Sequence, residues 1–352
     1  MLTCRRAIVL AVMAFCVISG TLLAPVSNAA AAEPIKIRFT LDWKLQGLHA
    51  WYFWAKAKNY FAAENLDVTI DQGEGSTVTV TRIMSGAYDA GFGDLNAAIQ
   101  VAAAKPGEAP ITVYMIYNKA PFAIVTKASS PIHSIKDLSG HKVGGPPGGA
   151  TLALLPLLEA KNGVDPASVS ITNVAPSLQE QILIQGQVDA SLVFTATSYL
   201  NLLAQKLDPD KDFRWIYYAD SGIDLYSNGV MVSPKLVKEH PEAVRGLVRA
   251  INRALKETVT DPGAAVDLLA QVEPLINKDI EKRRLIYVYK ELIDTPESRD
   301  IGLGDVSDTR LDAAITTLVQ AYNLPRTPKA SEVFDRSFLP PKADRMPVTP
   351  TN

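Results

Sequence analysis

Cysteine is nearly absent from this sequence of 352 residues. The two cysteines, Cys4 and Cys16, lie within the first sixteen positions, so residues 17–352 contain none. Residues 17–352 therefore cannot form a disulfide among themselves. They also cannot supply a cysteine nucleophile or a thiolate metal site. The stability of the chain must come from apolar cores, which a chain of this length is able to build.

An excess of charge of one sign is also missing. The chain has 35 basic and 37 acidic side chains, for a net charge of −2, so we expect no nucleic acid as a partner. Hydrophobic residues make up 47% and charged residues 20% of the chain. These values are typical of a globular protein and argue against a disordered chain or a polytopic membrane protein. The length fits two domains, or one domain split in two.

The first 32 residues contain no Asp or Glu. Arg5 and Arg6 precede an apolar run over residues 7–23, and small residues at 28–32 follow it. This order predicts a secretory signal peptide, cleaved after Ala32, with sites after residues 29–31 as alternatives. The apolar run is shorter than the roughly 20 residues that span a bilayer, which disfavours an uncleaved anchor.

Cys16 raises the question of a lipoprotein, in which a cysteine becomes the lipidated first residue. Phe15 stands before it, where lipoprotein signals have a small residue, so we expect no lipidation. Cleavage after Ala32 removes both cysteines and leaves a mature chain without any thiol.

Short apolar runs alternate with helical patterns in two successive units. The first unit has expected strands at 35–41, 66–70, 90–92 and 111–117, and expected helices at 49–61, 76–85 and 96–104. The second has expected strands at 122–127, 142–145, 169–172, 190–193 and 213–218, and expected helices at 150–161, 178–184 and 197–205. Such alternation indicates an α/β protein with mainly parallel sheets.

The last third of the chain is mostly helical by pattern. Helices are expected at 235–239, 242–259, 263–271, 278–292 and 309–322, and the proline-rich residues from 325 on either wrap the surface or are disordered. This order suggests two lobes joined by crossing segments near 119–125 and 224–232, with the last helices packing on the first lobe. The ligand site of such a fold is expected in the cleft, beyond the carboxyl ends of the strands.

Several segments resemble one family. Leu41-Asp42-Trp43, followed after five residues by His49-Ala50, resembles the opening motif of the NMT1/THI5-like (SsuA/THI5-like) periplasmic binding proteins. Residues 57–68 resemble the family's "AKxxGYFxxxGLDV" signature, with Asn59 and Asn65 in place of its glycines. Further resemblances lie in the Gly-rich loop at 73–76, the "G-x-x-D-A/F" turns at 85–91 and 186–190, and the "DLKGKKIG"-like segment at 136–144. Together they cover nearly all of residues 35–325.

The resemblance implies a two-lobed binding protein of the type II topology, with a mixed, mainly parallel sheet in each lobe. Lobe one would comprise residues 33–121 and 229–325, lobe two residues 122–228, and the C-terminal tail residues 326–352. Such a periplasmic protein captures a small solute and delivers it to the inner-membrane permease of an ABC importer. We expect a monomer with no cofactor, no metal ligands and no catalytic residues.

Candidate ligand contacts in lobe one lie near the end of the first expected strand. Trp43 offers a flat face for stacking, and the neighbouring Trp51 either joins it or fills the core. Asp42 either accepts hydrogen bonds from the ligand or orders the loop. His49 stands where the family motif has its histidine, and it either bonds the ligand or is a satisfied histidine that caps the helix or orders the loop.

Two glycine-rich helix starts are candidates for backbone contacts with a ligand. Gly75 precedes and Ser76 begins one expected helix, and Gly149 precedes another whose first turn contains Thr151. Free N–H groups at such helix starts suit an anion. Ordinary turn and capping chemistry explains the same residues. The other candidates are Asp94 and Phe194, which end strands, and Tyr117 and Tyr226, which flank the crossing segments and either close over the ligand or pack the hinge.

The ligand class is left open by the sequence. Aromatic residues beside carboxylates favour a nitrogen heterocycle, such as a pyrimidine or thiamin precursor. The alternative is an alkanesulfonate, taurine, nitrate or another small anion at the glycine-rich helix starts. The family also includes a pyrimidine synthase of thiamin biosynthesis, which carries a histidine at the position of His49 and a cysteine-rich run where this chain has residues 222–229. The missing cysteines disfavour that enzyme, and a ligand sensor with a regulatory partner is a third possibility.

Overall fold

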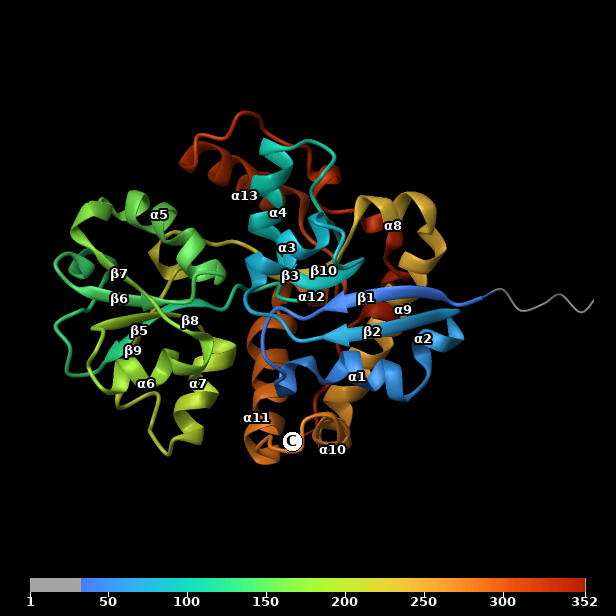
Figure 1. The fold of residues 1–352 in the computed structure, drawn as a ribbon, viewed down its shortest axis with the longest axis horizontal. Helices are drawn as coiled ribbons and strands as arrows, with labels where there is room; N and C mark the ends of the chain where they lie inside the picture. The colour runs from blue at the N-terminus through green and yellow to red at the C-terminus, as the bar shows by residue number, and fades with distance from the viewer. Residues whose placement is uncertain (1–32, 352) are drawn as a thin grey trace, which may run out of the picture. The chain divides into compact units, whose positions relative to one another are not determined.

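The computed structural model describes residues 33–351. The expected signal peptide, residues 1–32, and its two cysteines lie outside the described residues. The chain from Pro34 onward forms one compact unit. It contains two sheets of five strands each, with helices on both faces (Figure 1). The sheets and helices occur in the order expected for an α/β protein.

The first sheet has the strand order β2-β1-β3-β10-β4. Its strands are β1 (Ile35–Thr40), β2 (Leu66–Asp71), β3 (Ala90–Asp94), β4 (Ile111–Met115) and β10 (Asn228–Val232). Strand β1 pairs in parallel with β2 and β3, whereas β10 is antiparallel to both of its neighbours. The helices α1 (Ala50–Ala57), α2 (Tyr60–Ala63), α3 (Ser76–Met84) and α4 (Leu95–Ala104) connect its strands. We call this sheet and these helices lobe one.

The second sheet repeats the arrangement, with the order β7-β6-β8-β5-β9. Its strands are β5 (Phe122–Lys127), β6 (Lys142–Gly145), β7 (Ser170–Asn173), β8 (Ala190–Phe194) and β9 (Phe213–Tyr217). Strand β6 is parallel to β7 and β8, and β5 is antiparallel to both of its neighbours. With α5 (Ala150–Asn162), α6 (Gln179–Ile184) and α7 (Thr195–Ala204), this sheet forms lobe two.

The chain passes between the lobes twice, between β4 and β5 and again between β9 and β10. Each crossing segment ends in the antiparallel strand of the lobe that it enters. The expected crossing segments at 119–125 and 224–232 each overlap one of these passages. The mixed character of each sheet follows from them, since a strand that arrives from the other lobe runs against its neighbours.

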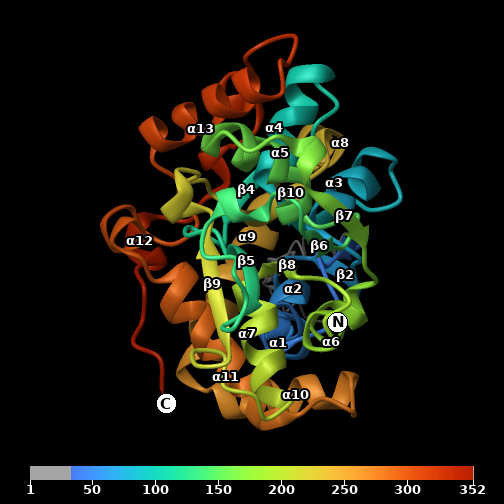
Figure 2. The ribbon, with the colours of Figure 1, turned by 90° about the vertical axis from the view of Figure 1, so that its left-hand side faces the viewer.

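The C-terminal helices are α8 (Pro234–Glu239), α9 (Pro241–Thr260), α10 (Pro262–Val272), α11 (Lys278–Val288, continued by a π-helical turn over Tyr289–Ile293), α12 (Pro296–Ile301) and α13 (Asp308–Ala321). Helix α9 packs on α1 of lobe one, as expected. Helix α11 also touches α7 of lobe two, and α13 lies against both α4 and α5 (Figure 2). The helical third therefore contacts both lobes and not only the first. Helix α12 was not expected, because its single turn is specified mainly by the Thr295 cap and Pro296.

The proline-rich tail wraps lobe one, which is one of the two alternatives left open. Thr112 of β4 donates its N–H to the Val333 carbonyl at 2.9 Å and accepts from the Asp335 N–H at 2.9 Å. The side chains of Phe338 and Arg345 are buried. The tail thus extends the first sheet beyond β4 and covers its edge.

Asn59 and Asn65, which replace the family's glycines, both have left-handed backbones, with φ of 59° and 57°. Asparagine tolerates this conformation better than other residues with a Cβ. Asn59 lies between α1 and α2, and Asn65 lies before β2, where the chain reverses. The departures from the signature therefore keep its backbone geometry.

Asn59→Ala is expected to lower the free energy of unfolding by about 1 kcal/mol, because a left-handed backbone strains a Cβ. Asn59→Gly is expected to leave it nearly unchanged, since glycine adopts this conformation freely. Urea unfolding of the two variants measures the difference. Equal stabilities of the glycine and alanine variants would show that the left-handed backbone is not what Asn59 provides.

Candidate functional site

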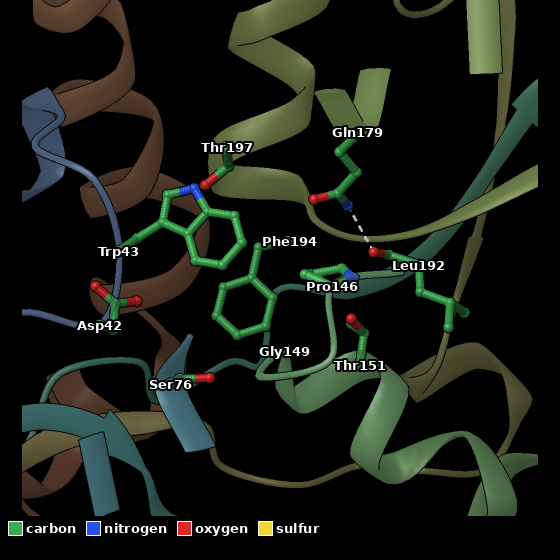
Figure 3. Close-up of a pocket in the computed structure, with 10 residues that line it drawn as sticks. All are labelled: Asp42, Trp43, Ser76, Pro146, Gly149, Thr151, Gln179, Leu192, Phe194 and Thr197. Carbon is green, nitrogen blue, oxygen red and sulfur yellow. Dashed lines mark hydrogen bonds between the residues drawn. The ribbon is translucent and has the colours of Figure 1, made fainter. Parts of the chain in front are cut away.

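A cavity lies between the lobes at the carboxyl ends of β1, β6 and β8, the edge where α/β sheets bind ligands (Figure 3). The cavity itself has a volume of about 30 Å³, and the empty space around its lining, open solvent included, is about 370 Å³. Ten residues line it: Asp42, Trp43 and Ser76 from lobe one, and Pro146, Gly149, Thr151, Gln179, Leu192, Phe194 and Thr197 from lobe two. The structure thus brings together six of the predicted residues: Asp42, Trp43, Ser76, Gly149, Thr151 and Phe194.

Two aromatic rings border the cavity, one from each lobe. Trp43 follows β1, and the Gly73 N–H donates to its carbonyl at 3.0 Å. Phe194 ends β8 and packs on Phe122, with 5.5 Å between ring centroids. Both side chains are half-buried, and Figure 3 shows their rings exposed to the cavity. A planar ligand between the lobes can therefore contact an aromatic face on either side.

Asp42 is the ionisable residue of the lining, and its carboxylate is held from behind. One oxygen, Oδ1, lies 2.8 Å from His49 Nε2, and the other, Oδ2, accepts from Asn228 Nδ2 at 2.8 Å. The residue is only 4% exposed. Each carboxylate oxygen accepts up to two hydrogen bonds, so Asp42 keeps acceptor capacity for a ligand in the cavity.

His49 orients Asp42 and does not line the cavity. Its Nδ1 accepts the Gln46 backbone N–H at 3.1 Å, so the ring proton of the neutral tautomer lies on Nε2 and is donated to Asp42. The ring is fully buried and uses both nitrogens. The structure therefore assigns His49 the loop-ordering role that was the alternative to ligand contact.

The rest of the lining offers neutral hydrogen-bonding groups. Gln179 donates its amide to the Leu192 carbonyl at 2.6 Å, which leaves its side-chain oxygen without a donor among residues 33–351. The hydroxyls of Ser76 and Thr151 likewise have no side-chain hydrogen bond within the described part of the chain. No Lys, Arg or His lines this cavity. The lining thus combines one carboxylate with neutral polar groups and apolar walls.

Trp51 and Tyr117 lie in the core of lobe one and not at the cavity. Both are fully buried, and Tyr117 packs edge-on against Phe92 at 5.2 Å between ring centroids. Trp51 lies on the face of α1 that packs into the lobe, which is the core-filling alternative for that residue. Neither residue lines the cavity.

Gly75 lies beside the cavity, at a contact between the lobes. A Cβ on it would stand 2.1 Å from the Gly148 carbonyl oxygen, and its φ is +151°. Its N–H donates to the Asp42 carbonyl at 2.8 Å. The hydroxyl and the N–H of Thr77 reach the same Gly148 carbonyl, at 2.8 and 3.3 Å. Glycine at 75 is therefore required for the lobes to approach this closely.

Tyr226 takes part in a hydrogen-bond network at the crossing segments, away from the cavity. Its hydroxyl donates to Glu297 and accepts the Ser307 N–H at 2.8 Å, and the Arg310 guanidinium lies 4.1 Å from its ring centroid. Arg310 also donates to the Asn118 carbonyl at 2.9 Å. The structure thus places Tyr226 in the hinge packing that was the alternative to ligand contact.

Asp94 caps helix α4 and does not line the cavity. Its carboxylate accepts the Ala97 N–H at 3.0 Å and the Asn96 side-chain amide at 3.2 Å. The group is 1% exposed, and this burial raises the pKa of Asp94 to about 6. The carboxylate is thus a helix cap whose ionised form is disfavoured.

The raised pKa of Asp94 predicts a pH-dependent stability. Between about pH 4 and 6 the folded protein holds a proton on Asp94 that the unfolded chain releases. Protonation of Asp94 therefore stabilises the fold at low pH, and this stabilisation is lost as the pH rises through 6. Asp94→Asn keeps the cap and removes the titration. Relative to the unchanged protein, the variant should gain stability between pH 4 and 7.5 in urea unfolding. Parallel pH profiles for the two proteins would contradict this expectation.

Four residues that line the cavity, and one residue that holds Asp42 in place, were not predicted from the sequence. Pro146, Gln179, Leu192 and Thr197 line the cavity, and Asn228 anchors Asp42. Only Asn228 carried a signal, as a polar residue within the expected crossing segment 224–232; its burial and its register with Asp94 are seen only in the structure. The others become site residues only when β8 and its flanking helices are assembled.

Neither a membrane span nor a metal cluster is found among residues 33–351. No helix there is both long and apolar enough to cross a bilayer. No group of three or more His, Cys, Asp or Glu in this part of the chain is placed to hold a metal ion.

Comparison with known proteins identifies the family. The model of the family described as NMT1/THI5 like matches residues 46–265, more than half of the chain. The chain belongs to the NMT1/THI5-like family. The family resemblance that the sequence suggested is thereby confirmed.

Relatives of this family member include binding proteins and enzymes. The riboflavin-binding protein RibY of Chloroflexus aurantiacus is 27% identical over 299 residues, 82% of each chain. The 4-amino-5-hydroxymethyl-2-methylpyrimidine phosphate synthase THI13 of Saccharomyces cerevisiae is 25% identical, over 71% of this chain and 74% of the yeast protein.

Among solved structures, the alkanesulfonate-binding protein SsuA of Xanthomonas axonopodis pv. citri, bound to MOPS, has the same fold. Its TM-score is 0.64 at 18% identity, covering 86% of this chain and 98% of that one. The periplasmic binding protein fold with two mixed sheets is thus confirmed, and ligand binding is the function that this fold supports.

Proposed function

We propose that this NMT1/THI5-like protein is the solute-binding component of an ABC importer, and that it captures a planar nitrogen heterocycle between its lobes. The observation that carries the proposal is the lining of the cavity. Trp43 and Phe194 provide aromatic faces from opposite lobes, and the buried Asp42 beside Trp43 is the charged group of the lining. A flat ring that carries N–H donors is complementary to this arrangement.

The polarity of the lining favours a ligand that donates hydrogen bonds. Asp42 and the side-chain oxygen of Gln179 accept hydrogen bonds, and the hydroxyls of Ser76 and Thr151 accept as well as donate. Hydrogen bonds to a carboxylate are stronger than those to neutral acceptors. A ring N–H or an exocyclic amino group aimed at Asp42 would therefore fix the orientation of the heterocycle.

The names of two relatives support the same ligand class. One is a riboflavin-binding protein and the other synthesises a substituted pyrimidine phosphate. Isoalloxazine and pyrimidine are both planar nitrogen heterocycles. The ligand proposed here is of that class, with pyrimidines and flavins as the first compounds to test.

A small anion is the alternative ligand class. Helix α5 begins at the cavity, and the backbone N–H groups of its first turn suit an anion. The carboxylate of Asp42 in the same lining repels one, and the lining has no Lys or Arg to offset that repulsion. The heterocycle is therefore the better match.

The synthase activity of some relatives is not part of our proposal. His49, at the position of the histidine that the enzyme branch carries, uses both ring nitrogens in fixed hydrogen bonds to Gln46 and Asp42. The sequence has no cysteine beyond Cys16. The chain is therefore proposed to bind its heterocycle and release it unchanged.

The setting proposed for this activity is the periplasm. Residues 1–32 have the order of a cleaved export signal. Ligand bridging the lobes stabilises their closed arrangement. A closed monomer then presents both lobes to a membrane permease of the ABC importer.

A thermal-shift screen tests the proposed ligand class. The panel comprises riboflavin, aminopyrimidines, alkanesulfonates, taurine and nitrate. A ligand at 100 times its dissociation constant adds about 2.7 kcal/mol to the free energy of unfolding, enough for a readable shift. We expect stabilisation by a heterocycle. Stabilisation by sulfonates or nitrate alone would contradict the proposed class.

A further inference from the structure

We propose that Arg284, which lies outside the cavity, is a positioning residue that holds the lobe-two wall of the site against lobe one. The proposal rests on the proposed capture between closing lobes. In this role, Arg284 also favours the closed arrangement of the lobes when no ligand is bound. The contacts of helix α11 with both lobes carry it.

Arg284 reaches from α11 into lobe two. Its Nη1 donates to the carbonyls of Ala196 and Thr197 at 2.8 and 2.7 Å, and its Nη2 donates to Asn201 Oδ1 at 2.8 Å. All three acceptors belong to α7, and Thr197 lines the ligand cavity. Arg284 is only 1% exposed. Its side chain therefore fixes the start of α7 through three donated bonds.

Glu281, one turn before Arg284, joins the same contact to lobe one. Its carboxylate accepts from Arg284 Nε at 2.8 Å and from the Gly47 N–H at 2.5 Å. Gly47 begins the short helical turn Gly47–His49, whose His49 orients Asp42. A continuous path thus runs from Asp42 through His49, Glu281 and Arg284 to Thr197. It connects the two walls of one cavity.

Gly47 shows how tightly this path is packed. A Cβ at Gly47 would stand 2.0 Å from the Glu281 carbonyl oxygen. The turn and α11 therefore cannot separate without breaking the packing of lobe one. Opening of the lobes has to break the bonds from Arg284 to α7 and not the bond from Gly47 to Glu281.

The electrostatics argue that Arg284 serves the contact between lobes and not the stability of α7. A cation at the first turn of a helix has the unfavourable sign for the helix dipole. Burying a guanidinium is costly unless an opposite charge accompanies it, and Glu281 supplies that charge. Glu180 of lobe two is also near enough for Arg284 to favour its ionised form, although burial raises the pKa of Glu180 on balance.

The bonds to α7 exist only while the lobes are together. In the open arrangement the Arg284 guanidinium and its α7 acceptors return to water, while Glu281 keeps its place on lobe one. Thr197 adds a smaller contact of the same kind, donating to Gln46 Oε1 at 3.2 Å. Arg284 therefore biases the lobes toward closure and sets where Thr197 stands in the cavity.

Distances between the lobes measured by spin labels test this role. The full chain carries Cys4→Ser and Cys16→Ser, so labels attach only to cysteines introduced at the exposed Lys36 of lobe one and Lys211 of lobe two. In the ligand-free protein, Arg284→Met is expected to lower the population with the shorter distance by about tenfold. Gly75→Ala, whose Cβ collides with Gly148, supplies the distance of the open arrangement.

Three further variants separate positioning from folding. Arg284→Lys should restore part of the closed population, because an ammonium reaches one or two of the acceptors. Asn201→Ala removes one acceptor from the side of lobe two and should shift the distances less, in the same direction. Arg249→Met breaks an ion pair with Glu64 that joins helix α9 to lobe one, and it should leave the distances unchanged.

An unchanged distance distribution in a folded Arg284→Met protein would overturn the proposal. If that variant does not fold, an unchanged distribution in Asn201→Ala overturns it instead. The proposed function fails separately: it is contradicted if no heterocycle binds to the unchanged protein, whatever the lobe distances do. Suppose that Trp43→Ala loses ligand binding and that Arg284→Met leaves the lobe distances unaltered. These results would support capture of the ligand between the lobes and would exclude the proposed role of Arg284.

Discussion

Trp43→Ala is expected to weaken heterocycle binding by more than about tenfold while the protein stays folded. The indole forms one aromatic wall of the cavity, and stacking on such a face contributes beyond the apolar area that it buries. Trp43 lies in a loop after β1 and is half-buried, so its removal leaves no large hole in either core. Isothermal titration with the heterocycle that gives the largest thermal shift measures the effect.

The matched control for this change is Trp215→Ala. Trp215 lies in β9 of lobe two and donates its indole N–H to the Pro209 carbonyl at 2.9 Å, away from the cavity lining. Trp215→Ala also removes an indole side chain, and it should leave the affinity for the heterocycle unchanged. Equal affinities of folded Trp43→Ala and the unchanged protein would remove Trp43 from the site.

Asp42→Asn is the second change with a large expected effect, and the direction of the change in affinity distinguishes the ligand classes. For a ligand that donates N–H groups, we expect affinity to fall by about 10- to 100-fold, since a hydrogen bond to a charged acceptor is lost. For a sulfonate or nitrate, loss of the negative charge should raise affinity. Calorimetric titration of both ligand classes measures the two effects on one variant.

Asp42→Asn also disturbs the support behind the site. Its new amide group would face the side-chain amide of Asn228, which now donates to Asp42 at 2.8 Å. Thermal unfolding therefore accompanies the titration. Asp67→Asn, at an exposed position of β2, is the control for removal of one negative charge from lobe one. Unchanged heterocycle affinity in folded Asp42→Asn would exclude the carboxylate as a ligand contact.

The sheets and the two crossings could be predicted because they depend on local patterns. Alternating strands and helical periods mark each α/β unit, and a strand that enters from the other lobe has to run against its neighbours. The pairing of Thr112 with the tail could not be predicted. It joins residues more than two hundred positions apart, and nothing local to Phe334 specifies its partner.

The site residues likewise divide into those that local sequence patterns predict and those that depend on distant contacts. Asp42 and Trp43 follow a strand whose carboxyl end faces the cleft, so their position in the sequence was sufficient. Trp51 could not be separated from them, because its face of α1 is decided by packing. Gln179 and Arg284 carry no signal of their own, since their roles arise from contacts between elements distant in the chain.

The central claim is that the protein captures a planar nitrogen heterocycle between Trp43 and Phe194. The most direct test is a calorimetric titration of the full chain with riboflavin and an aminopyrimidine, set beside methanesulfonate and nitrate under the same conditions. We predict that one of the heterocycles binds with a stoichiometry of one, and that Trp43→Ala weakens this binding by more than about tenfold. Binding of methanesulfonate or nitrate with no binding of either heterocycle would contradict the claim.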